Sequence, residues 1–252
     1  MMSQLWGLYA REVLRTFRNP FVLAFTVISP FMWLVFFGSS FASDAQYLHL
    51  GTNNYIAFLL PGVLSTSMLS IGMFGSMSTI QDKRFGFMKR ILITPTSKGT
   101  VFLAKAFGAA TRGLIQIPIM IVAALVFGVT FPLSVLDWVA WIVGLMFLGI
   151  GFCSLFLAMT ASSTDWQTPG VVSNFITLPL MFSSSYLVPN TTFPPWLRAL
   201  SDVNPITFAT ELGRSFVIGG GTPGIDLGYL AIWAAVLGGI GYVVSARYLK
   251  VE

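Results

Sequence analysis

Charged residues are scarce in this sequence and gather in one short stretch, QDKRFGFMKRILITP, at residues 81–95. Only 9% of the 252 residues are Asp, Glu, Lys or Arg. The stretch nevertheless places five charged residues among apolar ones: Asp82, Lys83, Arg84, Lys89 and Arg90, with Phe85, Phe87 and Met88. Apolar side chains can supply buried anchors at an interface, and charges can select a partner and set the register. The chemistry predicted here is therefore binding to a protein or a lipid surface.

Residues suited to catalysis or metal binding are almost missing from the sequence. His49 is the only histidine and Cys153 the only cysteine, so His-based zinc sites, Ser-His arrangements and an internal disulfide are excluded. The phosphate-binding pattern G-x-x-x-x-G-K-[ST] does not occur, and residues 97–100 have those residue types in another order. We therefore expect no catalytic site, no metal and no bound cofactor in this chain.

The rest of the composition places the chain in a membrane. Hydrophobic residues make up 55% of the sequence and the mean hydropathy is +0.80. Soluble domains contain about 45–50% apolar residues. The net charge of +5 does not indicate nucleic-acid binding, because the basic residues do not form one face. An integral membrane protein in a lipid bilayer is the expected class.

The elements that position the charged stretch are predicted to be membrane-spanning helices. About 20 apolar residues cross a bilayer as a helix. Six stretches approach this length: Phe21–Phe41, Tyr55–Ile80, Thr100–Thr130, Trp138–Ala161, Pro169–Val188 and Ile225–Tyr248. The prediction is one all-helical transmembrane domain over residues 1–252, with six spans.

The Lys and Arg residues predict how these spans are oriented. Twelve of them lie on the side of the termini and two, Arg198 and Arg214, on the other side. Cytoplasmic loops carry the excess of Lys and Arg in membrane proteins. Both termini of a multi-pass plasma-membrane protein are therefore expected in the cytoplasm.

The chain before the first span is predicted to form an interfacial helix over residues 3–18. Trp6 and Phe17 fall on one helical face, and Arg11 and Arg15 on the opposite one. Such a basic amphipathic helix is suited to the cytoplasmic headgroup layer of the membrane.

Two further basic residues, Lys105 and Arg112, share one face of the third span. A charge at the centre of a bilayer costs about 2.5–3.5 kcal/mol even on a lenient scale. We therefore expect the membrane part of this helix to begin near Gly113. The alternative is that both side chains extend to the headgroups.

The charged stretch is predicted to form a short amphipathic helix within a loop at 81–98. Asp82 would lie in its first turn, where the helix dipole favours an anion, and Lys89 and Arg90 in a later turn. Pro95 ends the pattern. Apolar residues recur at helical spacing, namely Phe85, Met88 and Leu92. Such a helix either lies on the membrane or fills a groove on another protein, and both alternatives stay open.

A second region of interest is the long segment 189–222 between the last two spans. Asn204 is a good N-cap with Pro205 at the first helical position, and glycines at 219–221 end the predicted helix. About 14 residues at 1.5 Å each are too short to cross the bilayer, so we expect a re-entrant helical pair. Glu211 and Arg214 lie three residues apart on it, as a solvated pair or as a gate at the outer end.

Two patterns within the spans concern packing or cargo. The second span carries Met73, Phe74 and Met77, a pliable apolar lining for an amphipathic cargo or simple packing. Small residues at four-residue spacing allow close helix approach in the last span, within the monomer or between subunits: Ala231, Ala235 and Gly239.

Two stretches resemble the membrane subunits of type-2 ABC exporters, which include daunorubicin-resistance and nodulation-factor exporter permeases. The run DKRFGFMKRILITPTSKGTVFLAKAFGAATRGL is similar to the family's cytoplasmic segment, with matches at Asp82, Arg84, Gly86, Leu92, Thr94, Pro95 and Lys105. The run LSDVNPITFATELGRSFVIGG is similar to the family's Asn-Pro segment before the last span, with matches at Asn204, Pro205 and Arg214. Phe85-Gly86-Phe87 stands where members often carry Glu-Gly-Thr, so contacts with the partner are expected to differ.

The resemblance implies that residues 81–95 form a coupling helix on a separate ATP-binding subunit. Phe85, Phe87 and Met88 would be its anchors, and ATP and Mg would be bound by that partner. It also implies a dimer with a second permease copy or a close homologue, and outward movement of an amphipathic drug, lipid or lipid-linked glycan. An ion-coupled secondary transporter is the main alternative, which the near absence of intramembrane carboxylates weakens. A membrane-embedded enzyme and a non-transporting scaffold are further alternatives.

Overall fold

A computed structural model describes residues 2–18, 20–42, 50–92, 96–163, 165 and 167–248 of the chain. All regular elements within these ranges are helical. Along the chain they are α1 (Met2–Phe17), α2 (Pro20–Ser40), α3 (Tyr55–Arg84), α4 (Phe87–Leu92), α5 (Lys98–Leu114), α6 (Gln116–Val126), α7 (Val135–Ser162), α8 (Gln167–Phe182), the 3-10 turn η1 (Asn190–Thr192), α9 (Pro195–Ser201), α10 (Pro205–Val217) and α11 (Pro223–Tyr248). The predicted all-helical class is confirmed.

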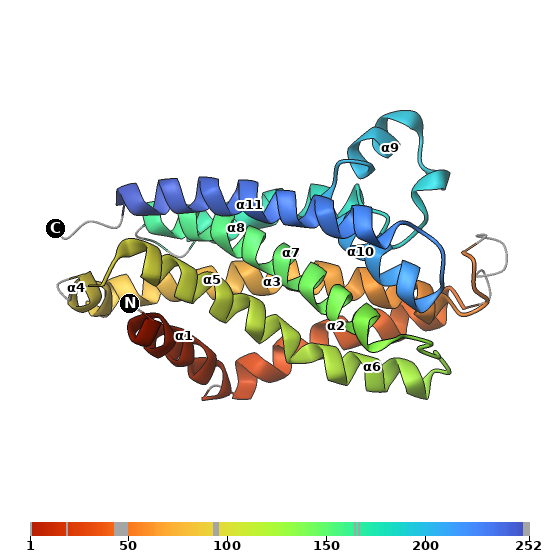
Figure 1. Cartoon of the computed structure of the whole chain (residues 1–252), viewed down its shortest axis with the longest axis horizontal. Coiled ribbons are helices and arrows are strands. Elements are labelled where there is room, and N and C mark those ends of the chain that lie inside the picture. Colours follow the sequence, from red (N-terminus) through yellow and green to blue (C-terminus); the bar gives the residue numbers. More distant parts are fainter. Residues whose placement is uncertain are drawn as a thin grey trace.

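The long helices run side by side and form a bundle with two ends (Figure 1). α1, α4 and the end of α11 lie at one end, and α9 and α10 lie at the other. α9 projects sideways from the bundle, whereas α10 packs against α3, α7 and α11. The charged loop and the outer region are therefore at opposite ends, as the predicted topology requires.

Four runs of helix in the described residues are long and apolar enough to cross a membrane, namely α3, α5 with α6, α7 and α11. The apolar part of α2, Ala24–Ser40, is shorter, and α8 has 16 residues. Six spans therefore stay a prediction, with α2 and α8 as the two additional ones.

Several helix boundaries differ from the predicted spans. α3 continues one turn past Ile80 to Arg84. The third span is interrupted between Leu114 and Gln116. The proline ring of Pro118 explains the interruption, because proline has no N–H to donate to the carbonyl four residues earlier and clashes with it. α8 ends at Phe182 rather than Val188.

The core is built around α3, which is buried along most of its length. Leu60, Leu64 and Met68 of α3 belong to the same buried cluster as Trp141 and Phe152 of α7. Because α3 is in the centre of the bundle and leads directly into the charged loop, that loop is attached to the most rigidly packed helix of the protein.

The helices α7 and α11 approach each other closely at Gly241. A Cβ atom at this position would collide with the backbone carbonyl of Ser154. Gly239, which belongs to the small-residue pattern predicted for close packing, has nothing within 4 Å. The prediction that the stripe of Ala231, Ala235 and Gly239 packs within the monomer is therefore wrong for Gly239. The rotation of α11 about its axis turns Gly241, and not Gly239, toward α7.

We expect Gly241→Ala to destabilise the purified protein by about 1–3 kcal/mol, because an extra carbon forces the two backbones apart. Thermal unfolding in detergent measures the change. Gly239→Ala is the matched control and should unfold like the wild type. Equal effects of the two substitutions would contradict the assigned contact.

Candidate functional site

The charged loop begins with a sharp turn between α3 and α4. The amide of Phe85 donates to Gln81 O at 3.0 Å and that of Gly86 to Lys83 O at 3.1 Å, which closes the last turn of α3. Gly86 has φ +67°, a left-handed conformation that glycine adopts without steric cost. Asp82 consequently lies in the last turn of α3. Its predicted place in the first turn of the loop helix is wrong, because α3 continues to Arg84 before the turn at residues 85–86.

The side chains of this loop differ sharply in exposure. Phe85 is 82% exposed at the turn, and Arg84 and Arg90 are also exposed. Met88 is buried against Ile91 and Val101, so its predicted role as an anchor for a partner is wrong. The predicted apolar stripe is wrong as well, because Phe85 precedes α4 and does not share a face with Met88.

Phe87, the third predicted anchor, is partly buried by contact with α1. The guanidinium carbon of Arg11 lies 3.7 Å from the centre of the Phe87 ring. This cation–π contact joins α1 to the first residue of α4. Leu92 is the last residue of α4, and Pro95 lies outside the described residues.

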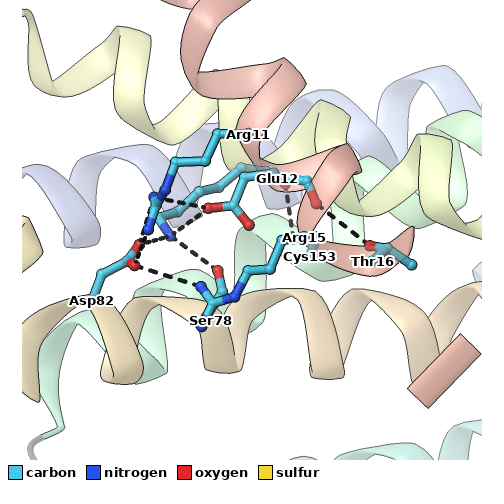
Figure 2. A network of polar contacts seen from close by, with 8 residues as sticks. Arg11, Glu12, Arg15, Thr16, Ser78, Asp82 and Cys153 are labelled. Atoms are coloured by element: carbon cyan, nitrogen blue, oxygen red, sulfur yellow. Dashed lines mark hydrogen bonds and ion pairs between the residues drawn. The ribbon is translucent and has the colours of Figure 1, made fainter. Parts of the chain in front are cut away.

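Asp82 is the centre of a buried ion network that lies directly beneath the turn (Figure 2). Lys105 of α5 donates from Nζ to Asp82 Oδ2 at 2.6 Å and to Glu12 Oε1 of α1 at 3.2 Å. A third donation reaches Ser78 Oγ of α3 at 2.9 Å. The network thus connects α1, α3 and α5 through one ammonium group.

Two arginines of α1 add to the network from its open side. Arg11 Nη2 donates to Asp82 Oδ1 at 2.7 Å, and Arg15 Nη1 lies 3.5 Å from the same oxygen. Figure 2 shows both side chains reaching from α1 toward Asp82. Each oxygen of the Asp82 carboxylate therefore faces a cation, which compensates for its removal from water.

Burial makes this network different from a surface salt bridge. The side chains of Lys105 and Glu12 are each 5% exposed and that of Asp82 3%. Lys105 therefore does not extend to lipid headgroups, and that alternative is wrong for it. The physical reason is that two carboxylates from neighbouring helices neutralise the ammonium group where it lies.

The orientation of α1 follows from the same contacts. Trp6 and Phe17 are exposed, as expected of a helix at a membrane interface, whereas Arg11 and Arg15 point into the protein. Glu12 was not singled out by the sequence analysis, although it is the only acidic residue among the first 43. A single carboxylate in so long a basic and apolar segment is a signal that could have found it.

At the outer end, Arg214 of α10 holds the chain that follows α8. It donates from Nε to Phe58 O at 3.1 Å, and from Nη2 to Ser185 O at 2.7 Å and Tyr186 O at 3.2 Å. Nη1 donates to Glu211 Oε1 at 2.8 Å.

The Glu211–Arg214 pair is not the solvated pair that was one of its two predicted roles. The Arg214 side chain is 6% exposed and that of Glu211 40%. The guanidinium is buried where it donates to the backbone carbonyls of Ser185 and Tyr186, which follow the end of α8. Asn204 caps α10 by accepting from Ile206 N at 2.9 Å, with Pro205 as the first residue.

A cavity of about 580 Å³ lies between α2, α3 and the end of α8. It has aromatic walls, no charged side chain and a group of hydroxyls, namely Thr26, Ser29, Thr66, Ser67 and Ser70. Phe74 lines it, whereas Met77 is buried in packing and Met73 packs against the core. Neither methionine is among the residues that line this cavity, and a cargo path lined by Met73 and Met77 stays a prediction.

Comparison with known proteins decides the class. Residues 3–217 match the family of ABC-2 type transporters. The chain belongs to this family. A putative transport permease, ycf38, of Cyanophora paradoxa is 28% identical over 212 residues, covering 83% of this chain and 72% of that protein. The daunorubicin resistance ABC transporter permease protein DrrB1 of Streptomyces coeruleorubidus is 22% identical over 222 residues, covering 86% and 75%. The inner membrane transport permease YadH of Escherichia coli K12 is 23% identical over 214 residues, covering 82% of each chain.

The predicted resemblance is therefore confirmed, and the protein is a membrane permease subunit of an ABC transporter. In the described part of this ABC-2 permease, no group of three or more His, Cys, Asp or Glu side chains is placed to hold a metal ion. The arrangement at the charged loop consists of an exposed tip above a buried ion network, which is suited to binding and to transmitting force.

We expect Lys105→Met to lower the free energy of unfolding by about 3–5 kcal/mol, because it leaves Glu12 and Asp82 buried with too little positive charge. Denaturant unfolding in detergent measures the loss. Arg18→Met, on an exposed arginine of the same segment, should have little effect. The double variant Glu12→Gln with Lys105→Met should unfold at a higher denaturant concentration than Lys105→Met alone. A stable Lys105→Met protein would contradict the network.

Arg214→Lys should loosen the segment after α8, because lysine keeps the charge but has no planar set of donors for three carbonyls. Hydrogen–deuterium exchange of the amides at 183–188 should become faster. Arg198→Lys, on an exposed arginine of α9, is the control and should leave this exchange unchanged. Unaltered exchange in Arg214→Lys would overturn the assigned role.

Proposed function

We propose that this permease moves an amphipathic cargo outward and is driven by a separate ATP-binding subunit that binds the turn at Arg84–Arg90. The observation that carries the proposal is the exposed aromatic ring of Phe85, flanked by exposed arginines, at the tip of a helix that is buried along most of its length. A large aromatic side chain surrounded by charge is typical of an interface anchor. This anchor stands at the end of the bundle that the Lys and Arg distribution assigns to the cytoplasm.

The ion network supports force transmission from this turn. Phe85 follows α3 without an interruption, and the next helix begins two residues later. Asp82 lies three residues before Phe85 and is bonded to α5 through Lys105 and to α1 through Arg11. A displacement of the turn would therefore move the ends of three helices together. Because α3 runs to the outer end of the bundle as one helix, it can act as a rigid lever.

The cavity between α2, α3 and α8 supports an amphipathic cargo. Its aromatic walls suit an apolar body, and its hydroxyl groups suit neutral polar groups. Phe25 of α2, which lines the cavity, is itself largely exposed, and α8 carries further exposed apolar side chains such as Phe175. We propose that a second permease copy or a close homologue covers this side and completes the path. A drug, a lipid or a lipid-linked glycan would fit this description.

Phe85→Asp tests the docking turn, because a charge at the anchor position prevents its burial against a partner. An ATP-binding subunit co-expressed with the permease should co-purify with the wild type and be lost from this variant. Trp196→Asp is the matched control, since Trp196 is also a strongly exposed aromatic residue and belongs to α9 at the opposite end. The control should retain the subunit. Equal recovery with Phe85→Asp would refute the docking turn.

Reconstitution separates the proposal from the ion-coupled alternative. Vesicles that contain only the permease and a fluorescent cationic amphipath should show no uptake in response to a proton or sodium gradient. Uptake that follows an ion gradient without any ATP-binding subunit would favour the secondary transporter.

A further inference from the structure

The two lysines that flank α4 are bonded to the ends of helices other than their own. Lys83 belongs to the last turn of α3, and its ammonium group lies at the C-terminal end of α7. Its Nζ donates to Thr160 O at 3.2 Å, to Ser163 O at 3.2 Å and also to Ala161 O. Three backbone carbonyls at the end of one helix thus share a single cation.

Lys98 makes the corresponding contact with α11. It is the first residue of α5, and its Nζ donates to Ala246 O at 3.0 Å, near the end of α11. One turn further along α5, the rings of Phe102 and Tyr242 meet edge to face with centroids 5.6 Å apart. The start of α5 is therefore joined to α11 by a polar and an aromatic contact at the same level.

Both contacts have a common physical basis. The last four carbonyls of a helix have no partner within the helix, and the helix dipole concentrates negative potential there. A lysine ammonium group supplies three donors and a full positive charge, and it therefore satisfies both requirements. Near the hydrocarbon region such unpaired carbonyls are costly, so the lysine contacts resist separation.

Because of the position of the two lysines, these contacts link α4 to further helices. Lys83 immediately precedes the turn that leads into α4, and Lys98 begins the helix that follows α4. Without them, the direct links of α4 would be to α3, to α5 and, through the contact of Arg11 with Phe87, to α1. With them, it is also linked to α7 and α11, which pack against one another, and α11 in turn packs against α10 at the outer end.

We propose that Lys83 and Lys98 are positioning residues that tie α4 to the cytoplasmic ends of α7 and α11. The loop and the ends of α3, α5, α7 and α11 then form one body. The two lysine contacts do not depend on the proposed function, but their role in transmission rests on it. If an ATP-binding subunit moves α4, the displacement reaches α7 and α11 as well as α3 and α5, the two helices that the loop connects.

The permease alone, in lipid nanodiscs, provides the test. Cys153 is replaced by Ala to remove the natural thiol, and spin labels are attached to cysteines at exposed positions. One pair, Phe85→Cys with Ser162→Cys, reports the loop relative to α7. The other pair, Phe85→Cys with Tyr248→Cys, reports the loop relative to α11. Pulsed electron–electron double resonance then measures the distribution of distances between the two spin labels of each pair.

Lys83→Met should broaden and shift the distribution for α7 and leave that for α11 as it is. Lys98→Met should do the reverse, so each variant is the matched control for the other. Lys83→Arg and Lys98→Arg should restore the narrow distributions, because a guanidinium also donates to carbonyls. This rescue separates the contact from a general need for a long side chain.

The proposal is overturned if neither Met variant changes its own distribution, or if both variants broaden both distributions to the same extent. The second result would mean general loosening of the fold. No ATP-binding subunit is present in the measurement, so its outcome does not depend on docking. Equal recovery of the ATP-binding subunit with Phe85→Asp in the co-purification experiment would refute the proposed docking turn and leave this result standing.

Discussion

The buried contact of Lys105 with Asp82 and Glu12 is the interaction on which the end of the bundle that carries the charged loop depends. Moving one ammonium group out of water is expensive, and only nearby opposite charges with good geometry compensate for it. The two carboxylates come from α3 and α1, so the requirement for neutrality sets the positions of three helices at once. The exposed turn that follows Asp82 is thereby held at a defined place on the surface.

At both ends of the bundle, backbone carbonyls that lack a helical partner accept hydrogen bonds from a basic side chain. At the end that carries the charged loop, Lys83 and Lys98 bond carbonyls at the ends of α7 and α11. At the outer end, Arg214 bonds carbonyls of the irregular chain after α8. In each case a cation from one segment satisfies backbone groups of another, because buried carbonyls without partners are unstable. Basic residues in this family member are therefore structural links as well as markers of topology.

Sequence reasoning succeeded where a property is local. The amphipathic helix at the N-terminus, the cap at Asn204 and the end of α10 before its glycines depend on neighbours within a few residues, and the structure shows them close to the predicted positions. It failed where a helix boundary depends on distant contacts. Asp82 was placed in the wrong helix because the pattern of charges alone does not reveal that α3 continues past the apolar run to reach Lys105. Met88 was taken for an exposed anchor because periodicity shows which residues share a face, but not which face meets the rest of the protein.

By itself, the sequence determined that the chain lies in a membrane, that its regular elements are helices, and that its basic residues belong mainly to one side. These follow from the free energy of transferring apolar side chains and charges between water and lipid, which depends on residue type. Only the tertiary structure decided which basic residues bond groups inside the protein and which are exposed at its surface. Lys83, Lys98 and Lys105 bond groups that are 23 to 148 residues away along the chain, and such partners are selected by the packing of whole helices.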